Sequence, residues 1–297
     1  MFVKHNNLTE IKNYFKVQLT EFSNTERSSM VRQLAVKRLG ISAAEFLLSD
    51  DVLLSESDLL YFRSAVKRLQ ANEPFQYILG ELEFYGVVLR SDRRALVPRP
   101  ETEELVDWVV QTLDGCESKL VLDLCSGSGC IAFALKRALP MLVVKAMELS
   151  EEAFELIREN TELTTIAIDV VKADVLIPES YSRFQKKSFD VWVSNPPYIP
   201  GSDKKRMHKN VLDFEPHMAL FVADKDPLLF YREVAINAKE YLKHEGYLFF
   251  EINEDFGTEM IDLLSSLGFV NIELRKDMQG RARMMRAQNV LLSYESK

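Results

Sequence analysis

The stretch KLVLDLCSGSGCIA, residues 119 to 132, is an apolar run that breaks into small residues and glycine. The run from Lys119 to Leu124 is typical of a buried strand, because it is short, apolar and followed by turn-forming residues. Gly127, Gly129 and Ala132 satisfy the spacing G-x-G-x-x-G/A. That spacing marks a strand-to-helix turn at which the backbone approaches a ligand closely, although a tight turn alone would also explain it.

Strand-like and helix-like patterns alternate through the rest of this half of the chain. Strands that alternate with helices of ten or more residues indicate βαβ units and a largely parallel sheet, which binds ligands at the carboxyl ends of its strands. The predicted strands are 119–124, 142–147, 167–172, 189–193 and 247–252, and the predicted helices are 130–139, 151–161 and 228–242.

The first 71 residues have a different pattern, with apolar residues three and four positions apart from Leu8 onward. This spacing predicts a bundle of about four or five helices. Ser42 with Glu45, and Ser55 with Asp58, fit capping boxes. Such a bundle is either a packing module or a docking site for a substrate.

Short β-like runs at 84–89 and 95–97 predict a hairpin that connects the two halves, and Pro100 suits the first turn of the next helix. We therefore expect a helical domain over 1–82, a hairpin linker over 83–98 and an α/β domain over 99–297.

Composition excludes several classes of protein. The 297 residues are 47% hydrophobic and 28% charged, with no run near the roughly 20 apolar residues of a membrane span and no secretory signal at the start. We expect a cytoplasmic protein. The net charge of −8 weighs against a nucleic-acid partner. Cys116, Cys125 and Cys130 lack CxxC spacing and the four histidines are scattered, so we expect neither a disulfide framework nor a metal site.

Acidic residues after the predicted strands point to a nucleoside cofactor. Glu148 closes the second strand about 20 residues after the glycines, where a carboxylate accepts hydrogen bonds from a ribose. Asp123 precedes the glycines. Its negative charge would repel a pyrophosphate but would attract the sulfonium and α-ammonium groups of S-adenosylmethionine. This favours the methyl donor over NAD. Asp174 is placed to accept from an adenine amino group, or is simply solvated.

The segment SNPPYIP, Ser194 to Pro200, follows the fourth predicted strand and therefore lies at the same sheet edge. The carboxamide oxygen of Asn195 and the carbonyl of Pro196 are two adjacent acceptors, which suit the two hydrogens of an NH2 group. Tyr198 adds a flat face for a planar amide or base. The segment predicts methyl transfer to a delocalised nitrogen, driven by alignment at about 3 to 3.5 Å and exclusion of water rather than by a strong base.

These motifs resemble the HemK/PrmC family of protein-(glutamine N5) methyltransferases, which modify the GGQ glutamine of peptide chain release factors. The resemblance covers nearly the whole chain. It is carried by EPFQYILGELEFYG (73–86), LVPRPETEELV (96–106), LDLCSGSGCIA (122–132), VSNPPYIP (193–200), DFEPHMAL (213–220) and KDMQGRARMMRA (276–287).

The resemblance implies a Rossmann-like class I S-adenosylmethionine-dependent methyltransferase domain with a seven-stranded mixed sheet, behind a helical N-terminal domain and a hairpin. Its last two strands would be 270–275 and 283–290. The family commonly has glycine at the position of Cys125 and often an aromatic residue at that of Val175.

Together the motifs and the resemblance give the following expected site. The cofactor would contact Asp123, Cys125, Ser126, Gly127, Ser128, Gly129, Glu148, Asp174, Val175 and Asn195; the glutamine would contact Asn195, Pro196, Pro197 and Tyr198; and Asn195, Pro196 and Tyr198 would be catalytic.

Three alternatives remain open from the sequence. The acceptor could be a glutamine of a ribosomal protein, since subfamilies differ mainly in the N-terminal domain. It could be the N6 of adenine in DNA or RNA, because adenine methyltransferases share the asparagine-proline-proline-tyrosine tetrad; a basic recognition region is then expected, and KKRMHK (204–209) is the one candidate. Lastly, the chain could bind S-adenosylmethionine without chemistry.

Overall fold

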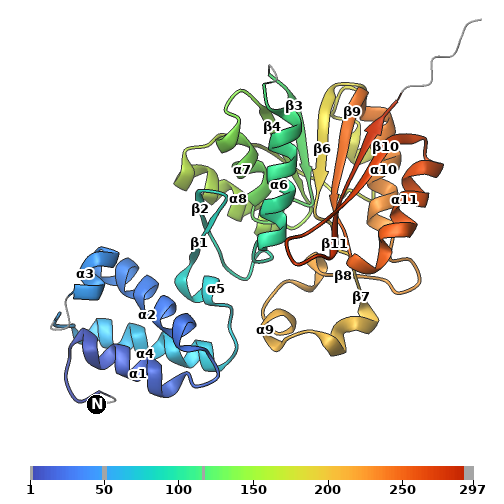
Figure 1. Cartoon of the computed structure of the whole chain (residues 1–297). Coiled ribbons are helices and arrows are strands. Elements are labelled where there is room, and N and C mark those ends of the chain that lie inside the picture. The colour runs from blue at the N-terminus through green and yellow to red at the C-terminus, as the bar shows by residue number, and fades with distance from the viewer. Residues whose placement is uncertain (1–2, 49–51, 116–117, 291–297) are drawn as a thin grey trace, which may run out of the picture. The chain divides into compact units, whose positions relative to one another are not determined.

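The computed structural model describes residues 3–48, 52–115 and 118–290, so Cys116 lies outside the described residues (Figure 1). The chain divides into two compact units. One comprises residues 1–81 with 208–214, and the other comprises residues 82–207 with 215–297.

The first unit contains a helical bundle. The predicted capping boxes are confirmed: the backbone N–H of Glu45 donates to Ser42 Oγ at 3.1 Å, and Ser55 and Asp58 cap each other in the same way. Apolar residues spaced by three and four along these helices form one core, which includes Leu8, Phe15 and Phe62. The helices of this unit are α1 (Leu8–Gln18), α2 (Asn24–Leu39), α3 (Ala43–Leu48), α4 (Glu56–Gln70), α5 (Phe75–Leu79) and α9 (Lys209–Leu212).

The hairpin lies earlier in the chain than predicted. It pairs β1 (Glu81–Phe84) with β2 (Val87–Arg90), and its two turn residues, Tyr85 and Gly86, have φ of 47° and 75°. Positive φ at both positions is the geometry of a type I′ turn, which suits a two-residue loop. The predicted second run, 95–97, is not a strand. Ala95 and Val97 are buried and Leu96 is partly exposed, and Ala95 packs against a helix of the second unit rather than in a ladder.

A seven-stranded mixed sheet forms the centre of the second unit, which confirms the predicted fold class. The strand order is β10-β11-β9-β6-β3-β4-β5, and β11 runs antiparallel to both of its neighbours. The strands are β3 (Leu120–Leu124), β4 (Val143–Glu148), β5 (Asp169–Lys172), β6 (Phe189–Ser194), β9 (Leu242–Glu251), β10 (Phe269–Lys276) and β11 (Ala282–Asn289), with a separate short pair, β7 (Ile199–Pro200) and β8 (Phe221–Val222).

Helices cover both faces of this sheet (Figure 1). Val121 and Leu122 of β3 point to opposite faces: Val121 packs with α6 and α7, and Leu122 packs with α10 and α11. Among the described residues, no helix is long and apolar enough to span a membrane. The helices are α6 (Pro100–Leu113), which begins at the predicted proline, α7 (Cys130–Ala138), α8 (Glu151–Thr164), α10 (Leu229–Tyr241) and α11 (Gly257–Ser266), which the sequence interpretation missed.

The register of the sheet decides where the functional side chains lie. Leu124 at the end of β3 is level with Met147 of β4 on one side and with Ser194 of β6 on the other, and Ser194 is level with Phe250 of β9. The next residue of each strand therefore lies at the carboxyl-terminal edge of the sheet. These residues are Cys125, Glu148, Asn195 and Glu251. Strand order reverses at β3, and the crevice at such a reversal is where doubly wound sheets bind ligands.

Candidate active site

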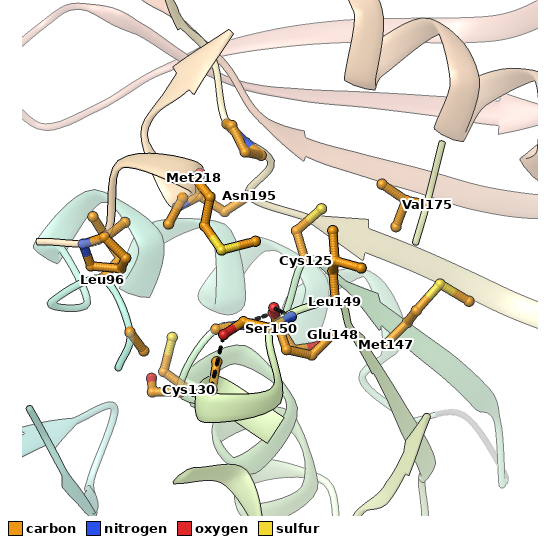
Figure 2. Close-up of a pocket in the computed structure, with 18 of the residues that line it drawn as sticks. Leu96, Cys125, Cys130, Met147, Glu148, Leu149, Ser150, Val175, Asn195 and Met218 are labelled. Carbon is orange, nitrogen blue, oxygen red and sulfur yellow. Dashed lines mark hydrogen bonds between the residues drawn. The ribbon is translucent and has the colours of Figure 1, made fainter. Parts of the chain in front are cut away.

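A cavity of about 320 Å³ opens at this edge of the sheet, within the second unit (Figure 2). Figure 2 shows Cys125, Glu148, Leu149 and Asn195 around it, from the ends of three different strands. The lining includes most of the predicted site: Cys125, Ser126, Gly127, Ser128, Glu148, Asp174, Val175, Asn195 and Pro197. Other walls come from the segment 94–98, from Thr102 and from the segment 216–221.

The glycine turn follows β3 and requires unusual backbone. Cys125, Gly127 and Gly129 have φ of 58°, 56° and 80°, in the left-handed region. A Cβ added to Gly129 would lie 2.8 Å from Phe133, so this position also lacks space. Cys125 adopts the conformation that glycine takes without strain, which agrees with the glycine common at this position in the resembling family. The backbone at residue 125 is therefore kept at a cost of about 1 kcal/mol.

Glu148 lies beside the glycine turn and is nearly buried. One carboxylate oxygen accepts from the N–H of Gly127 at 2.8 Å, and the other accepts from the N–H of Ser150 at 2.8 Å. Burial raises the pKa of Glu148 above its usual range, and these backbone bonds oppose that rise. Because each carboxylate oxygen has a second lone pair, Glu148 is fixed in place and can still accept from a ligand.

Asp123 lies deeper than predicted, since it is fully buried and is not among the lining residues. Its Oδ2 accepts from the N–H of Ala132 at 3.3 Å, whereas Oδ1 has no hydrogen-bond partner among the described residues. Burial raises the pKa of Asp123 to about 8. A buried carboxyl with a free acceptor is the kind of group that a nearby cation stabilises in its charged form.

The loop after β5 forms another wall of the cavity. Asp174 accepts from the N–H of Leu176 at 2.9 Å, which fixes the loop, and the buried Val175 accepts at its carbonyl from the Tyr181 hydroxyl at 2.9 Å. Both residues line the cavity. Asp174 was expected there from its position after the third strand, and Val175 from the family resemblance.

Only part of the asparagine-proline-proline-tyrosine tetrad, Asn195 to Tyr198, lines the cavity. Asn195 and Pro197 line the cavity, whereas the buried Pro196 and the half-buried Tyr198 do not. The Nδ2 of Asn195 donates to Thr102 Oγ1 at 3.3 Å, and the Tyr198 hydroxyl donates to Glu251 Oε1 at 3.1 Å. The aromatic ring is thus tied to β9 through its hydroxyl.

Sequence reasoning did not select Thr102 and Glu251, and yet both contact the tetrad or each other. The Thr102 hydroxyl donates to Glu251 Oε2 at 2.6 Å, and both residues are almost wholly buried. Thr102 stands inside the segment PRPETE (98–103), which served as a helix-start signal and as part of the family resemblance but was given no role in the site. Glu251 closes an apolar strand, and a strand-end carboxylate was the signal already used for Glu148.

Another buried carboxylate, Glu215, joins two of the motifs. Glu215 accepts from the Arg99 guanidinium at 2.6 Å and from the N–H of Val97 at 3.2 Å. Burial raises the pKa of Glu215, and Arg99 opposes that rise. The ion pair holds the PRPETE segment to the segment around Met218, so two walls of the cavity are linked.

Comparison with known proteins shows the family of this chain. The PrmC N-terminal domain family matches residues 10–80, and the methyltransferase small domain family matches residues 105–214. A release factor glutamine methyltransferase of Flavobacterium psychrophilum is 37% identical over 93% of this chain and 91% of its own length. The chain belongs to the release factor glutamine methyltransferase family. Another member, from Bacteroides thetaiotaomicron, is 40% identical over 84% of this chain and 88% of its own length.

Solved structures confirm the fold at lower identity. The hMettl16 catalytic domain in complex with the MAT2A 3′UTR hairpin 6 superposes with a TM-score of 0.53 at 14% identity, over 83% of this chain and 87% of that one. The relatives confirm the resemblance to the HemK/PrmC family, and the solved structure confirms the Rossmann-like methyltransferase fold that the resemblance implied.

Proposed function

We propose that this protein transfers a methyl group from S-adenosylmethionine to the side-chain amide nitrogen of the glutamine in the GGQ motif of peptide chain release factors, leaving S-adenosylhomocysteine. The observation that carries the proposal is the position of Asn195. It lines the same cavity as Glu148, and its Nδ2 is already engaged by Thr102. Its Oδ1 is then the atom available to accept from an incoming NH2 group.

The residues at the carboxyl ends of β3, β4 and β5 suit S-adenosylmethionine. Glu148 would accept from the ribose hydroxyls, while the left-handed turn at Gly127 and Gly129 leaves room for a ligand against the backbone. Asp123, with its free buried oxygen, would favour the nearby cationic part of the cofactor. Asp174 would accept from the adenine amino group, with Val175 as an apolar wall. Cys125, Ser126 and Ser128 complete the turn.

The glutamine would bind at the tetrad. Asn195 Oδ1 and the Pro196 carbonyl would accept its two amide hydrogens, and the Tyr198 ring, with Pro197, would bound its plane. When bound, S-adenosylmethionine supplies an electrophilic methyl group. The chain's own contribution is alignment and exclusion of water: the two acceptors hold the amide nitrogen toward the donor, and the nitrogen loses one proton as or after its new bond to carbon forms.

We also propose that residues 1–82 form the substrate-docking domain, with 83–98 as the linker and 99–297 as the methyltransferase domain. Release factors act in the cytoplasm, so we expect the protein there.

The test is methyl transfer from labelled S-adenosylmethionine to an unmodified release factor, beside the same factor with its GGQ glutamine replaced by alanine. Label on the intact factor alone is the expected result. Equal labelling of both factors would reject the acceptor. No labelling of either, with cofactor binding intact, would reject the substrate class and direct the search to ribosomal proteins and then to adenine in nucleic acid.

A further inference from the structure

A chain of side-chain hydrogen bonds runs behind the tetrad. Asn195 Nδ2 donates to Thr102 Oγ1 at 3.3 Å, Thr102 Oγ1 donates to Glu251 Oε2 at 2.6 Å, and the Tyr198 hydroxyl donates to Glu251 Oε1 at 3.1 Å. One carboxylate is therefore bound directly to one tetrad side chain and through one hydroxyl to another.

With Glu251 ionised, the donors and acceptors in this chain allow one direction only. A threonine hydroxyl has a single hydrogen, and the 2.6 Å separation from Glu251 is that of a hydroxyl donating to an ionised carboxylate. Because that hydrogen is committed, Thr102 can offer only a lone pair to Asn195. Only the NH2 end of the Asn195 amide can use it. The network therefore assigns the amide orientation and turns Oδ1 away from Thr102.

The position of Glu251 next to Asn195 is fixed by the sheet and by its neighbours. Ser194 and Phe250 are level in the parallel pair β6–β9, so Asn195 and Glu251 follow at the same edge. The backbone around Glu251 is fixed by the Tyr231 hydroxyl, which donates to its carbonyl at 3.3 Å. Burial raises the pKa of Glu251, and nearby Arg283 together with the Thr102 and Tyr198 hydroxyls opposes that rise. A carboxylate with 1% exposure is costly to bury unless hydrogen bonds and a nearby cation compensate its charge, and these contacts supply that compensation.

We propose that Thr102 and Glu251 are positioning residues that select an NH2 group as the methyl acceptor. Glu251, acting through Thr102, keeps the carbonyl end of Asn195 toward the acceptor, and it holds Tyr198 directly. With the amide reversed, Asn195 would present a donor, which would repel an incoming NH2 group and lower the rate. The inference rests on the proposed function.

The decisive variants are Thr102→Val, which removes the hydroxyl and keeps the shape, and Thr102→Ser, which restores the hydroxyl. Thr112→Val is the matched control, because Thr112 lies on the same helix and its hydroxyl bonds to the Trp108 carbonyl and to Arg286 outside the cavity. Single-turnover methyl transfer at saturating cofactor, cofactor Kd by calorimetry and the unfolding midpoint are measured for each.

We expect Thr102→Val to lower the single-turnover rate about 10- to 100-fold, since misalignment of a reacting group costs this much. Cofactor Kd should stay within about threefold, and Thr102→Ser and Thr112→Val should remain within about threefold of wild type in rate. A Thr102→Val rate equal to wild type would overturn the inference. So would parallel losses of rate, cofactor affinity and unfolding midpoint, which indicate a purely structural role.

Glu251→Gln extends the test through the shared carboxylate. If Glu251 acts through Thr102, the double variant Thr102→Val/Glu251→Gln should lose less than the product of the single losses, whereas independent roles would multiply. Multiplying losses would overturn the proposed chain. The two proposals can also fail separately: label on adenine instead of glutamine, with the same pattern across variants, would reject the release-factor acceptor and retain the positioning role, because adenine also presents an NH2 group.

Discussion

The two sides of β3 hold their functional groups in different ways. On the β4 side, Glu148 is fixed by backbone N–H groups 21 and 2 residues away. On the β6 side, Asn195 is held by a side chain 93 residues away, and that side chain is held by Glu251, 149 residues farther along. The backbone turn is a rigid, locally encoded support. The side-chain relay depends on the whole fold, so its loss should disturb alignment more than binding.

The largest effect that the contrast predicts is on Asn195. Replacing Asn195 by alanine removes the acceptor for the substrate amide, and it should lower the rate of the chemical step about 10²- to 10³-fold, as loss of one preorganised polar group does at other active sites. Cofactor Kd, measured by calorimetry on the same preparation, should change by less than about threefold. Equal losses in rate and affinity would place Asn195 in the cofactor site alone and erase the distinction between the two sides.

On the other side of β3, Gly129→Ala should chiefly weaken cofactor binding and the fold. Left-handed backbone costs about 1 kcal/mol for alanine, and the crowding by Phe133 adds about 1–3 kcal/mol. Gly127→Ala is the matched control: its φ of 56° is also positive, but its added Cβ would meet only the Ala95 side chain, at 4.0 Å. Denaturant unfolding should therefore show a clearly larger loss for Gly129→Ala; similar losses would mean that space at the turn is unimportant.

A pH series would sharpen the role of Asp123. Its pKa of about 8, against an ordinary 3.8, means that this carboxyl is protonated in the folded protein and ionised in the unfolded one between those values. It therefore destabilises the fold as pH rises through that window. A bound cation favours the ionised form, so cofactor affinity should rise by up to about tenfold per pH unit and level off above pH 8.

The Asp123→Asn variant isolates this group from others that titrate in the same range. The difference in cofactor affinity between wild type and Asp123→Asn should grow from pH 6 to pH 8, as measured by calorimetry. Asp174→Asn is a control that keeps Asp123. A pH-independent difference would show that Asp123 does not sense the charge of the cofactor.

The smallest effect is expected at Cys125. Glycine adopts its φ of 58° without strain, so Cys125→Gly keeps the turn and should change cofactor Kd by less than about threefold. A tenfold loss would mean that the thiol itself, and not the backbone, contacts the cofactor.

The same contrast explains how far sequence reasoning reached. Glycine spacing and strand ends placed Gly127, Glu148 and Asn195 at one edge, because period and topology are encoded locally. The hairpin was misplaced because Tyr85 lacks the usual chemistry of a left-handed turn residue. Thr102 could not be found, since its role appears only when α6 brings it beside Asn195.

The most direct measurement of the central claim is a competition. One reaction would contain labelled S-adenosylmethionine, an unmodified release factor, ribosomal proteins and an adenine-containing oligonucleotide, followed by mass spectrometry of the labelled species. We expect the label on the side-chain amide of the GGQ glutamine. Label on the oligonucleotide or on a ribosomal protein in preference to the release factor would contradict it.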